Sequence, residues 1–502
     1  MTDENWIRKT LDSFDSRFRE IAIRSSEAAF NMYRGLEHED LDKIEAEESA
    51  LWREDDTQKL AQSTTASPEL ERPLFLIRQG VLSSRVEGIE QIYKAKNACN
   101  RELVEFRPEV DGEPISRSDL GELMRWEKDP LKRKCAAAAF VPLEETLHDK
   151  VLDLINRRNA AAKDLGYPSF AHLRFDLNEL DLDEVRSQLE DLLEKGTGDF
   201  ATVLDEHRDK PEVTPDGLLT SDLTFIHENY LPNLPRESFP ADRLIDVLRE
   251  EYRSVGVDLD KLPIETVIQD IPAGGFCFTF DPGKDVRILA NPRDGQMWYQ
   301  VLFHEYGHGV QGSVARGDGH YLVALGDPGF FWEGIAVLFE KLAMRGDFLW
   351  RQVDDVDAVE AFMDGARKRL AFGIRRLAIG SLFEYSLYLD PAPYDELRQR
   401  LGDMIRKYYG VEPAVDPPTF THDIFHITHP CYLQNYVLAE MIAAQLLESS
   451  ATKNGDAWEG GFAQRVINEL LVPGAMKTWR EKIEDFTGKP LSPDALVNGL
   501  FS

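Results

Sequence analysis

The feature that most constrains the fold is a pair of histidines four residues apart in an apolar stretch of sequence. His304 and His308 enclose Glu305 in the run HEYGH. Apolar residues recur around this run at helical spacing, at Tyr299, Phe303, Tyr306 and Val310. This spacing predicts a buried helix over about residues 295–313, with both histidines on one face and about one turn apart. Buried imidazole and carboxylate groups need partners, so the fold must supply them.

The same three residues are typical of a zinc-binding helix. Two imidazoles on one helix face can reach a single tetrahedral metal ion. Glu305 lies beside the first of these ligands, where it can take a proton from water on the metal. The alternative is an exposed pair of histidines with no metal, and the apolar surroundings of the run disfavour it. We therefore predict one Zn2+ per chain, with His304 and His308 as ligands.

A third protein ligand is expected on a following helix. The longer pattern HExxHxxGxxH is not met, because Gln311 and Val314 occupy the positions of its glycine and third histidine. Glu333 is the only charged residue in the apolar run 329–339, where a lone carboxylate is costly without a cation. It follows His308 by 25 residues, which is enough for a loop and a returning helix. We predict Glu333 as the third ligand. Weaker candidates in the intervening loop are Asp318, His320 and Asp327.

The rest of the chain predicts a mainly α fold. Most of the first 260 residues form polar, amphipathic patterns, as in 180–193, where apolar residues recur at helical spacing with acids between them. We expect a single helical domain over residues 1–502, with a mostly helical N-terminal part over 1–260 and the zinc site in 261–502.

The clearest strand signal lies directly before the metal helix, in residues 274–292. Aromatic residues alternate there, at Phe276, Phe278 and Phe280. The turn sequence Asp-Pro-Gly follows at 281–283, and a second apolar segment comes next. We therefore expect one small antiparallel β-sheet beside the metal helix.

The charge balance narrows the range of partners. The chain carries 58 Lys and Arg against 90 Asp and Glu, a net charge of −32. Nucleic acids and anionic membranes both require a basic surface, so neither is expected as a partner. The four cysteines are scattered without a CxxC pair, and we see neither a signal peptide nor an apolar run of transmembrane length. We expect a cytoplasmic protein whose oligomeric state the sequence leaves open.

HEYGH followed by a helical Glu resembles the glutamate-zincin peptidases. Within them the chain is similar to the superfamily that holds thimet oligopeptidase, oligoendopeptidase F, angiotensin-converting enzyme and carboxypeptidase Taq. Three further segments support the resemblance, which spans roughly residues 150–446. They are RRNAAAKDLGYPSFAHL at 157–173, GGFCFTFDPGKDVRI at 274–288 and FHITHPCYLQNYVLAEMIAAQL at 425–446. The resemblance implies two helical lobes around a deep channel that admits short unfolded peptides.

The resemblance also implies roles for residues outside the metal helix. His426 and Tyr436 match a catalytic His and a Tyr ten residues later in angiotensin-converting enzyme, where they would donate hydrogen bonds to the oxyanion. Tyr432 would share this role, and His429 is an alternative donor or a substrate contact. The peptide would lie as an added strand along the segment that begins with Gly274, Gly275 and Phe276.

The chain departs from each of these families in some positions. Val337 stands where angiotensin-converting enzyme has an Asp that supports a zinc histidine, so the partners of the ligands must differ. Ile424 replaces a Lys that holds the substrate carboxylate in peptidyl-dipeptidases, and the GxxQDxHW motif of carboxypeptidase Taq is missing. We expect an oligoendopeptidase-like zinc metallopeptidase. A metallocarboxypeptidase, a peptidyl-dipeptidase and, in another class, a catalytically silent peptide-binding protein remain alternatives.

Overall fold

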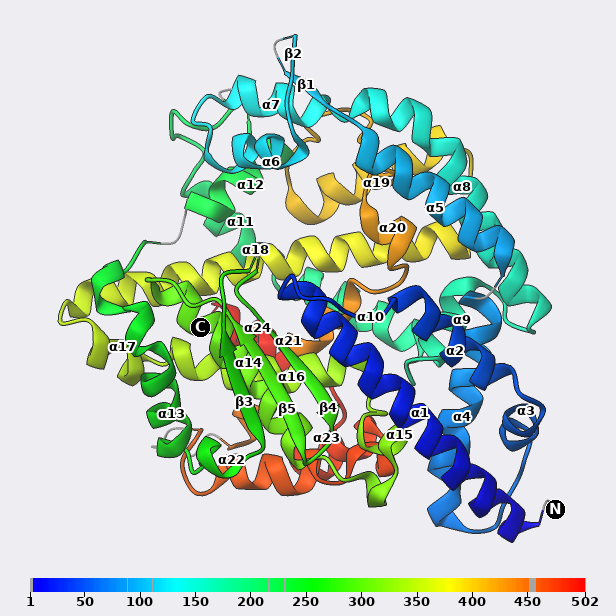
Figure 1. The fold of residues 1–502 in the computed structure, drawn as a ribbon. Coiled ribbons are helices and arrows are strands. Elements are labelled where there is room, and N and C mark those ends of the chain that lie inside the picture. Colours follow the sequence, from blue (N-terminus) through cyan, green and yellow to red (C-terminus); the bar gives the residue numbers. More distant parts are fainter. Residues whose placement is uncertain are drawn as a thin grey trace. The chain divides into compact units, whose positions relative to one another are not determined.

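The computed structural model describes residues 3–501 except 88, 111, 215–216, 230–231, 272 and 451–456. Helices make up most of this part of the chain, and the strands belong to two small sheets (Figure 1). The prediction of a mainly α fold is therefore confirmed. Within the described residues, no helix combines the length and the apolar character needed to cross a bilayer.

The chain divides into two compact units, each built from separate stretches of sequence. Unit 1 comprises residues 1–85, 234–360 and 438–495, and unit 2 comprises 86–233, 361–437 and 496–502. The N-terminal helices up to residue 85 thus share a unit with the metal helix. Helices that belong partly to each unit are α4 (Pro68–Glu87), α18 (Val356–Leu389), α21 (Gln434–Ser450) and α24 (Asp494–Phe501).

Unit 1 holds the three-stranded sheet and the helices that pack on it. Its helices are α1 (Glu4–Tyr33), α2 (Leu41–Arg53), α3 (Asp55–Ala61), α13 (Leu244–Ser254), α14 (Gln296–Val314), α15 (Tyr321–Ala324), α16 (Gly329–Glu340), α17 (Gly346–Gln352), α22 (Phe462–Arg465) and α23 (Trp479–Thr487). Its strands are β3 (Ile264–Ile268), β4 (Gly275–Asp281) and β5 (Asp285–Ala290).

Unit 2 is helical apart from a hairpin of two very short strands. Its helices are α5 (Glu90–Glu105), α6 (Arg117–Trp126), α7 (Pro130–Ala138), α8 (Val141–Asp164), α9 (Phe170–Asp176), α10 (Leu182–Lys195), α11 (Thr197–Asp205), α12 (Thr220–Asn229), α19 (Tyr394–Tyr409) and α20 (Ile424–Thr428). The hairpin pairs β1 (Glu109–Val110) with β2 (Glu113–Pro114).

The sheet of unit 1 is mixed, which corrects the expectation of a single antiparallel sheet. The predicted hairpin is present, because β4 and β5 pair antiparallel with Gly275 opposite Ala290. The strand order is β3-β5-β4, and β3 runs parallel to β5. Local alternation predicts a hairpin, but the parallel partner joins through a crossover that local patterns do not specify.

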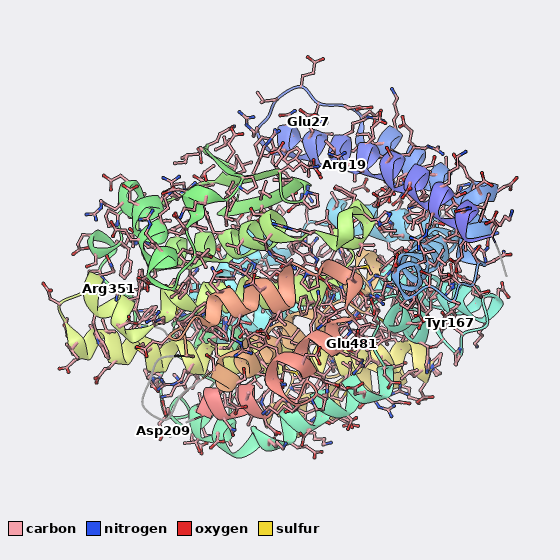
Figure 2. All side chains as sticks on the ribbon, turned by 90° about the horizontal axis from the view of Figure 1, so that it is seen from below. Arg19, Glu27, Tyr167, Asp209, Arg351 and Glu481 are labelled. Carbon is pink, nitrogen blue, oxygen red and sulfur yellow. The ribbon has the colours of Figure 1, made fainter. Side chains whose placement is uncertain are left out.

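The sheet lies between α1 on one face and α14 on the other. The alternating phenylalanines of β4 face α1, where Phe278 and Phe30 have ring centroids 5.4 Å apart. Arg19 of α1, labelled in Figure 2, pairs with Asp281 at the end of β4. On the opposite face, a Cβ added to Gly275 would lie 3.1 Å from Cγ of Glu305. The strand therefore approaches the metal helix closely because this position has no side chain.

Candidate metal centre

The helix that carries His304 and His308 forms where the sequence predicts it. α14 spans Gln296–Val314, within one residue of the expected bounds. His304 and His308 lie on one face of this helix, with ring centroids 4.9 Å apart. Their side chains are 21% and 17% exposed, so the imidazoles are largely buried but remain open to a small ligand.

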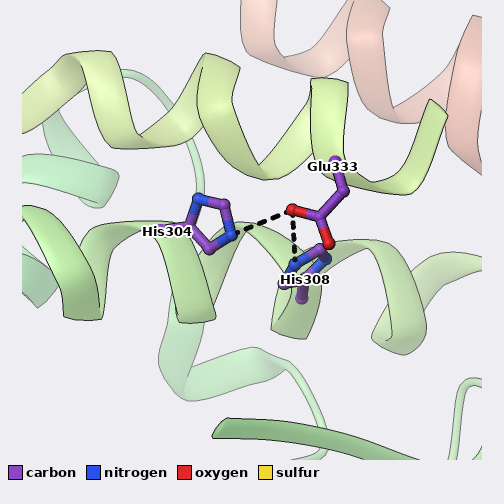
Figure 3. A group of neighbouring side chains, drawn as sticks. All are labelled: His304, His308 and Glu333. Carbon is purple, nitrogen blue, oxygen red and sulfur yellow. Dashed lines mark ion pairs between the residues drawn. The ribbon is translucent and has the colours of Figure 1, made fainter. Parts of the chain in front are cut away.

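Glu333 comes from α16 and faces both histidines. Its Oε2 lies 3.4 Å from Nε2 of His304 and 3.8 Å from Nε2 of His308 (Figure 3). One ligand atom from each of the three residues can be chosen so that all lie within 4.8 Å of one another. In the described part of the chain, this is the single group of His, Cys, Asp and Glu side chains with such an arrangement.

A glycine between the two histidines explains how α14 and α16 come so close. A Cβ added to Gly307 would lie 2.9 Å from Cα and 3.2 Å from the carbonyl oxygen of Ala336. The two helix backbones are therefore in direct contact at this crossing. Glu333 lies about one turn before Ala336, which brings its short side chain within reach of both imidazoles.

Two further polar residues support His304, and sequence reasoning missed them. Nδ1 of His304 lies 2.9 Å from Oε2 of Glu340, the last residue of α16. Gln300, one turn before His304, donates its amide to the other oxygen of Glu340. Glu340 follows Glu333 by seven residues, which is two helical turns, so both acids lie on the face that meets α14. This seven-residue spacing is the feature of the sequence from which the role of Glu340 could have been predicted.

The charges of the cluster suit a cation. Burial opposes a charge on His304, but hydrogen bonds to Glu333 and Glu340 raise its pKa to about 10. Burial, together with the neighbouring His304, lowers the pKa of His308 to about 4. The site thus offers one neutral imidazole, one imidazole held by carboxylates, and the carboxylate of Glu333. Two imidazoles and one carboxylate at these distances fit Zn2+, which takes three protein ligands in open sites.

Glu305 lies next to this cluster and beside β4. Burial raises the pKa of Glu305 to about 7, and the negative charge of Glu333 adds to this effect. The backbone of Cys277 in β4 lies near its carboxylate and favours the charged form, which lowers the pKa of Glu305 slightly. A carboxyl group with a pKa near neutrality can both accept and return a proton.

The predicted substrate strand is an edge strand. β4 stands at the end of the order β3-β5-β4, so one of its edges pairs with β5 and the other pairs with no described strand. Gly275 and Phe276 are its first residues, and the carbonyl of Gly274 accepts from the amide of Asn291. The Phe276 ring packs on Tyr33 at a centroid distance of 4.3 Å. An extended peptide can add to a free edge of this kind.

His426 is buried in unit 2. It lies in α20 with 3% of its surface exposed, and its ring contacts Phe383 and Phe420. Nδ1 lies 3.5 Å from Oε1 of Glu384, which is fully buried; this is an ion-pair distance rather than a hydrogen bond. The backbone carbonyl of His426 accepts from the buried Arg158, 2.7 Å away.

The other predicted residues of this segment form a row of rings in unit 2. His429 and Tyr432 have centroids 6.1 Å apart, and Tyr432 and Tyr436 lie 5.6 Å apart. His429 and Tyr436 are exposed, and Tyr432 is half-buried. The structure thus brings together His304, Glu305, His308 and Glu333 in unit 1, whereas His426 and these three rings belong to unit 2.

The loop between α14 and α16 is held by residues that were alternative ligands. Both oxygens of Asp327 accept from the buried Lys482, at 2.7 and 2.6 Å. His320 lies 3.2 Å from Oδ1 of Asp12. The side chain of Asp318 lies outside the described residues. Asp327 and His320 therefore stabilise the loop in this structure instead of joining the histidine cluster.

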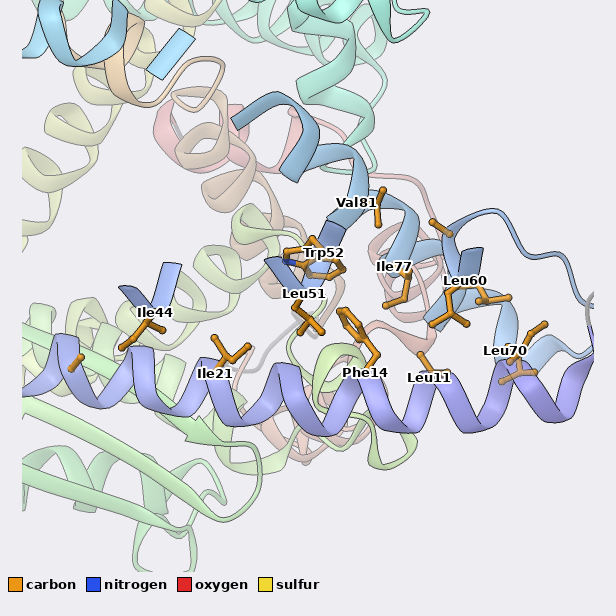
Figure 4. Close-up of a cluster of buried hydrophobic side chains, with 14 residues drawn as sticks. Leu11, Phe14, Ile21, Ile44, Leu51, Trp52, Leu60, Leu70, Ile77 and Val81 are labelled. Carbon is orange, nitrogen blue, oxygen red and sulfur yellow. The ribbon is translucent and has the colours of Figure 1, made fainter. Parts of the chain in front are cut away.

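The N-terminal helices anchor the same loop. Asp15 of α1 accepts hydrogen bonds from the backbone amides of Tyr321 and Leu322, both at 2.9 Å, and so caps α15. Leu322 also packs against the hydrophobic cluster that α1 forms with α2, α3 and α4 (Figure 4). The largest residues of this cluster include Phe14 and Trp52. The core around α1 thereby fixes the connection between the two ligand helices.

The sequence resembles neither the known protein families nor the curated proteins closely enough to give a match. The resemblance to the glutamate-zincin superfamily therefore stays a prediction. What the structure adds is the geometry of the cluster itself.

Proposed function

We propose that the chain is a zinc-dependent peptidase of the glutamate-zincin kind that cleaves short unfolded peptides. The observation that carries the proposal is the cluster of His304, His308 and Glu333, with Glu305 beside it. A protein that only binds peptides has no need for a buried carboxyl group next to the two histidines. Internal cleavage, as in oligoendopeptidases, is the mode that we favour.

The residues of unit 1 would have two roles in the reaction, to bind zinc and to transfer the proton. When bound by His304, His308 and Glu333, zinc supplies a Lewis acid that polarises the attacking water and the scissile carbonyl. Glu305 takes the proton of the attacking water and passes it to the leaving amine.

The substrate would bind as a strand along the open edge of β4. Main-chain hydrogen bonds give such binding little dependence on side chains, which suits an enzyme that accepts many peptides. Oxyanion donors would come from the segment 426–436. Tyr436 and His429 are exposed, whereas His426 must first be uncovered to reach a substrate. Exposure thus favours Tyr436, with His429 and Tyr432 as partners, and His426 remains a candidate through the resemblance.

We also propose a cytoplasmic location. The four cysteines form no disulfide, which suits a reducing compartment. The net charge of −32 leaves oligopeptides, rather than nucleic acids or membranes, as the partners of the site.

The experiment that tests the proposal is mass spectrometry of a defined peptide mixture after incubation with the full chain. One sample receives a chelator, a second receives chelator followed by zinc, and a third contains the Glu305→Gln variant. We expect internal cuts that the chelator abolishes and zinc restores, and no cuts by the variant. Loss of single C-terminal residues would instead indicate a carboxypeptidase, and release of dipeptides a peptidyl-dipeptidase. Peptides that bind to the zinc-loaded protein without being cut would establish the silent binding protein.

A further inference from the structure

We propose that Glu340, itself held by Gln300, is the positioning residue that fixes His304 as a metal ligand and thereby sets the affinity of the site for zinc. The proposal rests on the part of the proposed function that concerns metal binding, and it does not require peptidase activity. Nothing in the motif assigns this role, since HExxH and the distant Glu end at residue 333.

The geometry restrains the carboxylate on both sides. Oε2 of Glu340 meets Nδ1 of His304 at 2.9 Å, and Oε1 accepts the amide of Gln300. Gln300 and His304 lie one turn apart on α14, so the same helix contacts both oxygens. A carboxylate held at two points cannot rotate away from the imidazole, and the imidazole ring is oriented in turn.

This contact also selects the form of the imidazole that can bind a metal. A carboxylate accepts hydrogen bonds, so the proton of neutral His304 resides on Nδ1, which faces Glu340. Nε2 then carries the lone pair, and it is the atom that lies 3.4 Å from Oε2 of Glu333. The ligand atom therefore points to the place where His308 and Glu333 converge.

Glu340 forms its ion pair with His304 and not with the neighbouring Lys341. Lys341 is the next residue, and its ammonium group could compete for the same carboxylate. It lies instead 2.9 Å from Oε2 of Glu440 in α21. The side chain of Glu340 is 16% exposed, so water screens its interaction with His304 only weakly. Glu440 thus leaves Glu340 with His304 as its charged partner within hydrogen-bond distance.

The position of this support explains a departure noted in the sequence. Val337 occupies the place of a supporting acid one turn after the third ligand and cannot accept a hydrogen bond. Glu340 supplies the acid almost one turn further along α16. The two helices that carry the ligands therefore also carry the group that orients one of them.

The test is the zinc affinity of the full chain, measured by competition with a chromogenic chelator at fixed pH. We expect Glu340→Ala to weaken zinc binding by about 100-fold and Glu340→Gln by about 10-fold, because the amide oxygen can still accept the Nδ1 proton. Gln300→Ala should weaken it less than Glu340→Ala. The matched control is Glu251→Gln, which removes a buried carboxylate of unit 1 that pairs with Arg351 and Arg345. Its affinity should equal that of the wild type even if its melting temperature falls.

The outcomes separate this inference from the proposed function. Wild-type affinity in Glu340→Ala would overturn the inference, as would an equal loss in Glu251→Gln, which would indicate a general effect on folding. If Glu340→Ala does not fold, Glu340→Gln and Gln300→Ala decide the question, and unchanged affinity in both overturns it. Zinc binding that depends on Glu340 in a protein that cuts no peptide would refute the peptidase and leave the inference standing. A wild-type chain without zinc affinity would refute both.

Discussion

His304 in unit 1 and His426 in unit 2 each lie beside a buried carboxylate, yet the two contacts differ. Nδ1 of His304 meets Glu340 at 2.9 Å, whereas Nδ1 of His426 lies 3.5 Å from Glu384. The side chain of His304 is 21% exposed and that of His426 only 4%. The first imidazole therefore has one nitrogen held by Glu340 and the other facing Glu333, whereas the second is enclosed.

The surroundings of the two residues account for the difference. His304 lies between α14 and α16, and its two ring nitrogens face Glu340 and Glu333. His426 lies between aromatic rings, and Arg158 donates to its backbone carbonyl rather than to its ring. A histidine beside a carboxylate is thus not by itself a ligand or a catalytic group. What the second ring nitrogen faces, and how exposed it is, decide the role.

The largest expected effect follows from removing the third ligand. Glu333→Ala takes away the side chain that contacts both histidines, so zinc content after dialysis against a mild chelator should fall to background. Atomic absorption measures this directly, with wild-type protein treated in parallel. Full zinc content in the variant would mean that Asp327, His320 or Asp318 replaces Glu333. The assignment of Glu333 as the third ligand beside His304 and His308 would then be wrong.

Removing the base should leave the metal in place. We expect Glu305→Gln to lower kcat by about 10²–10⁴-fold with zinc content unchanged, because the amide cannot accept the proton of the attacking water. Single-turnover measurements on one quenched-fluorescence peptide give the rate constant of the chemical step without a contribution from product release. Near-normal turnover would show that another group is the base.

The unit 2 residues test whether exposure or resemblance identifies the oxyanion donor. Tyr436→Phe and His426→Ala should each lower kcat by about 10²-fold with zinc bound. His426→Ala should in addition lower the melting temperature, because it leaves a cavity and an unpaired Glu384 carboxylate. If both variants keep near-normal kcat, the role passes to His429 and Tyr432, which His429→Gln and Tyr432→Phe would reveal.

The last expected effect concerns the stability of the segment that carries His426, with no change in zinc binding. Burial opposes ionisation of Glu144, but hydrogen bonds from His422 and from the amides of Phe420 and Thr421 lower its pKa to about 2 from 4.5. The unfolded chain therefore binds this proton at higher pH than the folded chain does. The contribution, on the order of 3 kcal/mol, is complete above about pH 4.5 and is lost as the pH falls towards 2.

Denaturant unfolding of the wild type and Glu144→Gln measures this contribution. The difference in free energy of unfolding should be large at pH 7 and should narrow at pH 3. A difference that does not change with pH would show that Glu144 does not titrate in this way. Zinc affinity should be the same in both proteins at pH 7, since Glu144 belongs to unit 2.

Much of the unit 1 site could be predicted because its determinants are local. The spacing of His304 and His308 specifies one helix face, and the isolated charge of Glu333 in an apolar run predicts a buried carboxylate that needs a partner. Glu340 was not predicted because it directly follows that run, and a charged residue at the end of an apolar segment is common. The pairing of β3 with β5 was not predicted, because β4 lies between these two neighbouring strands in the sequence.

The unit 2 residues show the limit of spacing. His426 and His429 are three residues apart in and beside a short helix, yet one is buried and the other exposed. Spacing gives the relative direction of two side chains but not which one faces the core. That depends on Phe383 and Phe420, which come from other segments and which no motif of the sequence connects with His426.

The contact between Gly307 and Ala336 has a thermodynamic consequence. A metal bound at this crossing would act as a cross-link that closes the 25-residue segment between His308 and Glu333. Because the ion binds the crossed helices and not the unfolded chain, free zinc at about 100 times its dissociation constant would add about 2.7 kcal/mol to the stability of the folded state. The unfolding temperature of unit 1 would then rise with the logarithm of the zinc concentration. Thermal unfolding thus becomes a measure of metal binding that needs neither a substrate nor an assay of turnover.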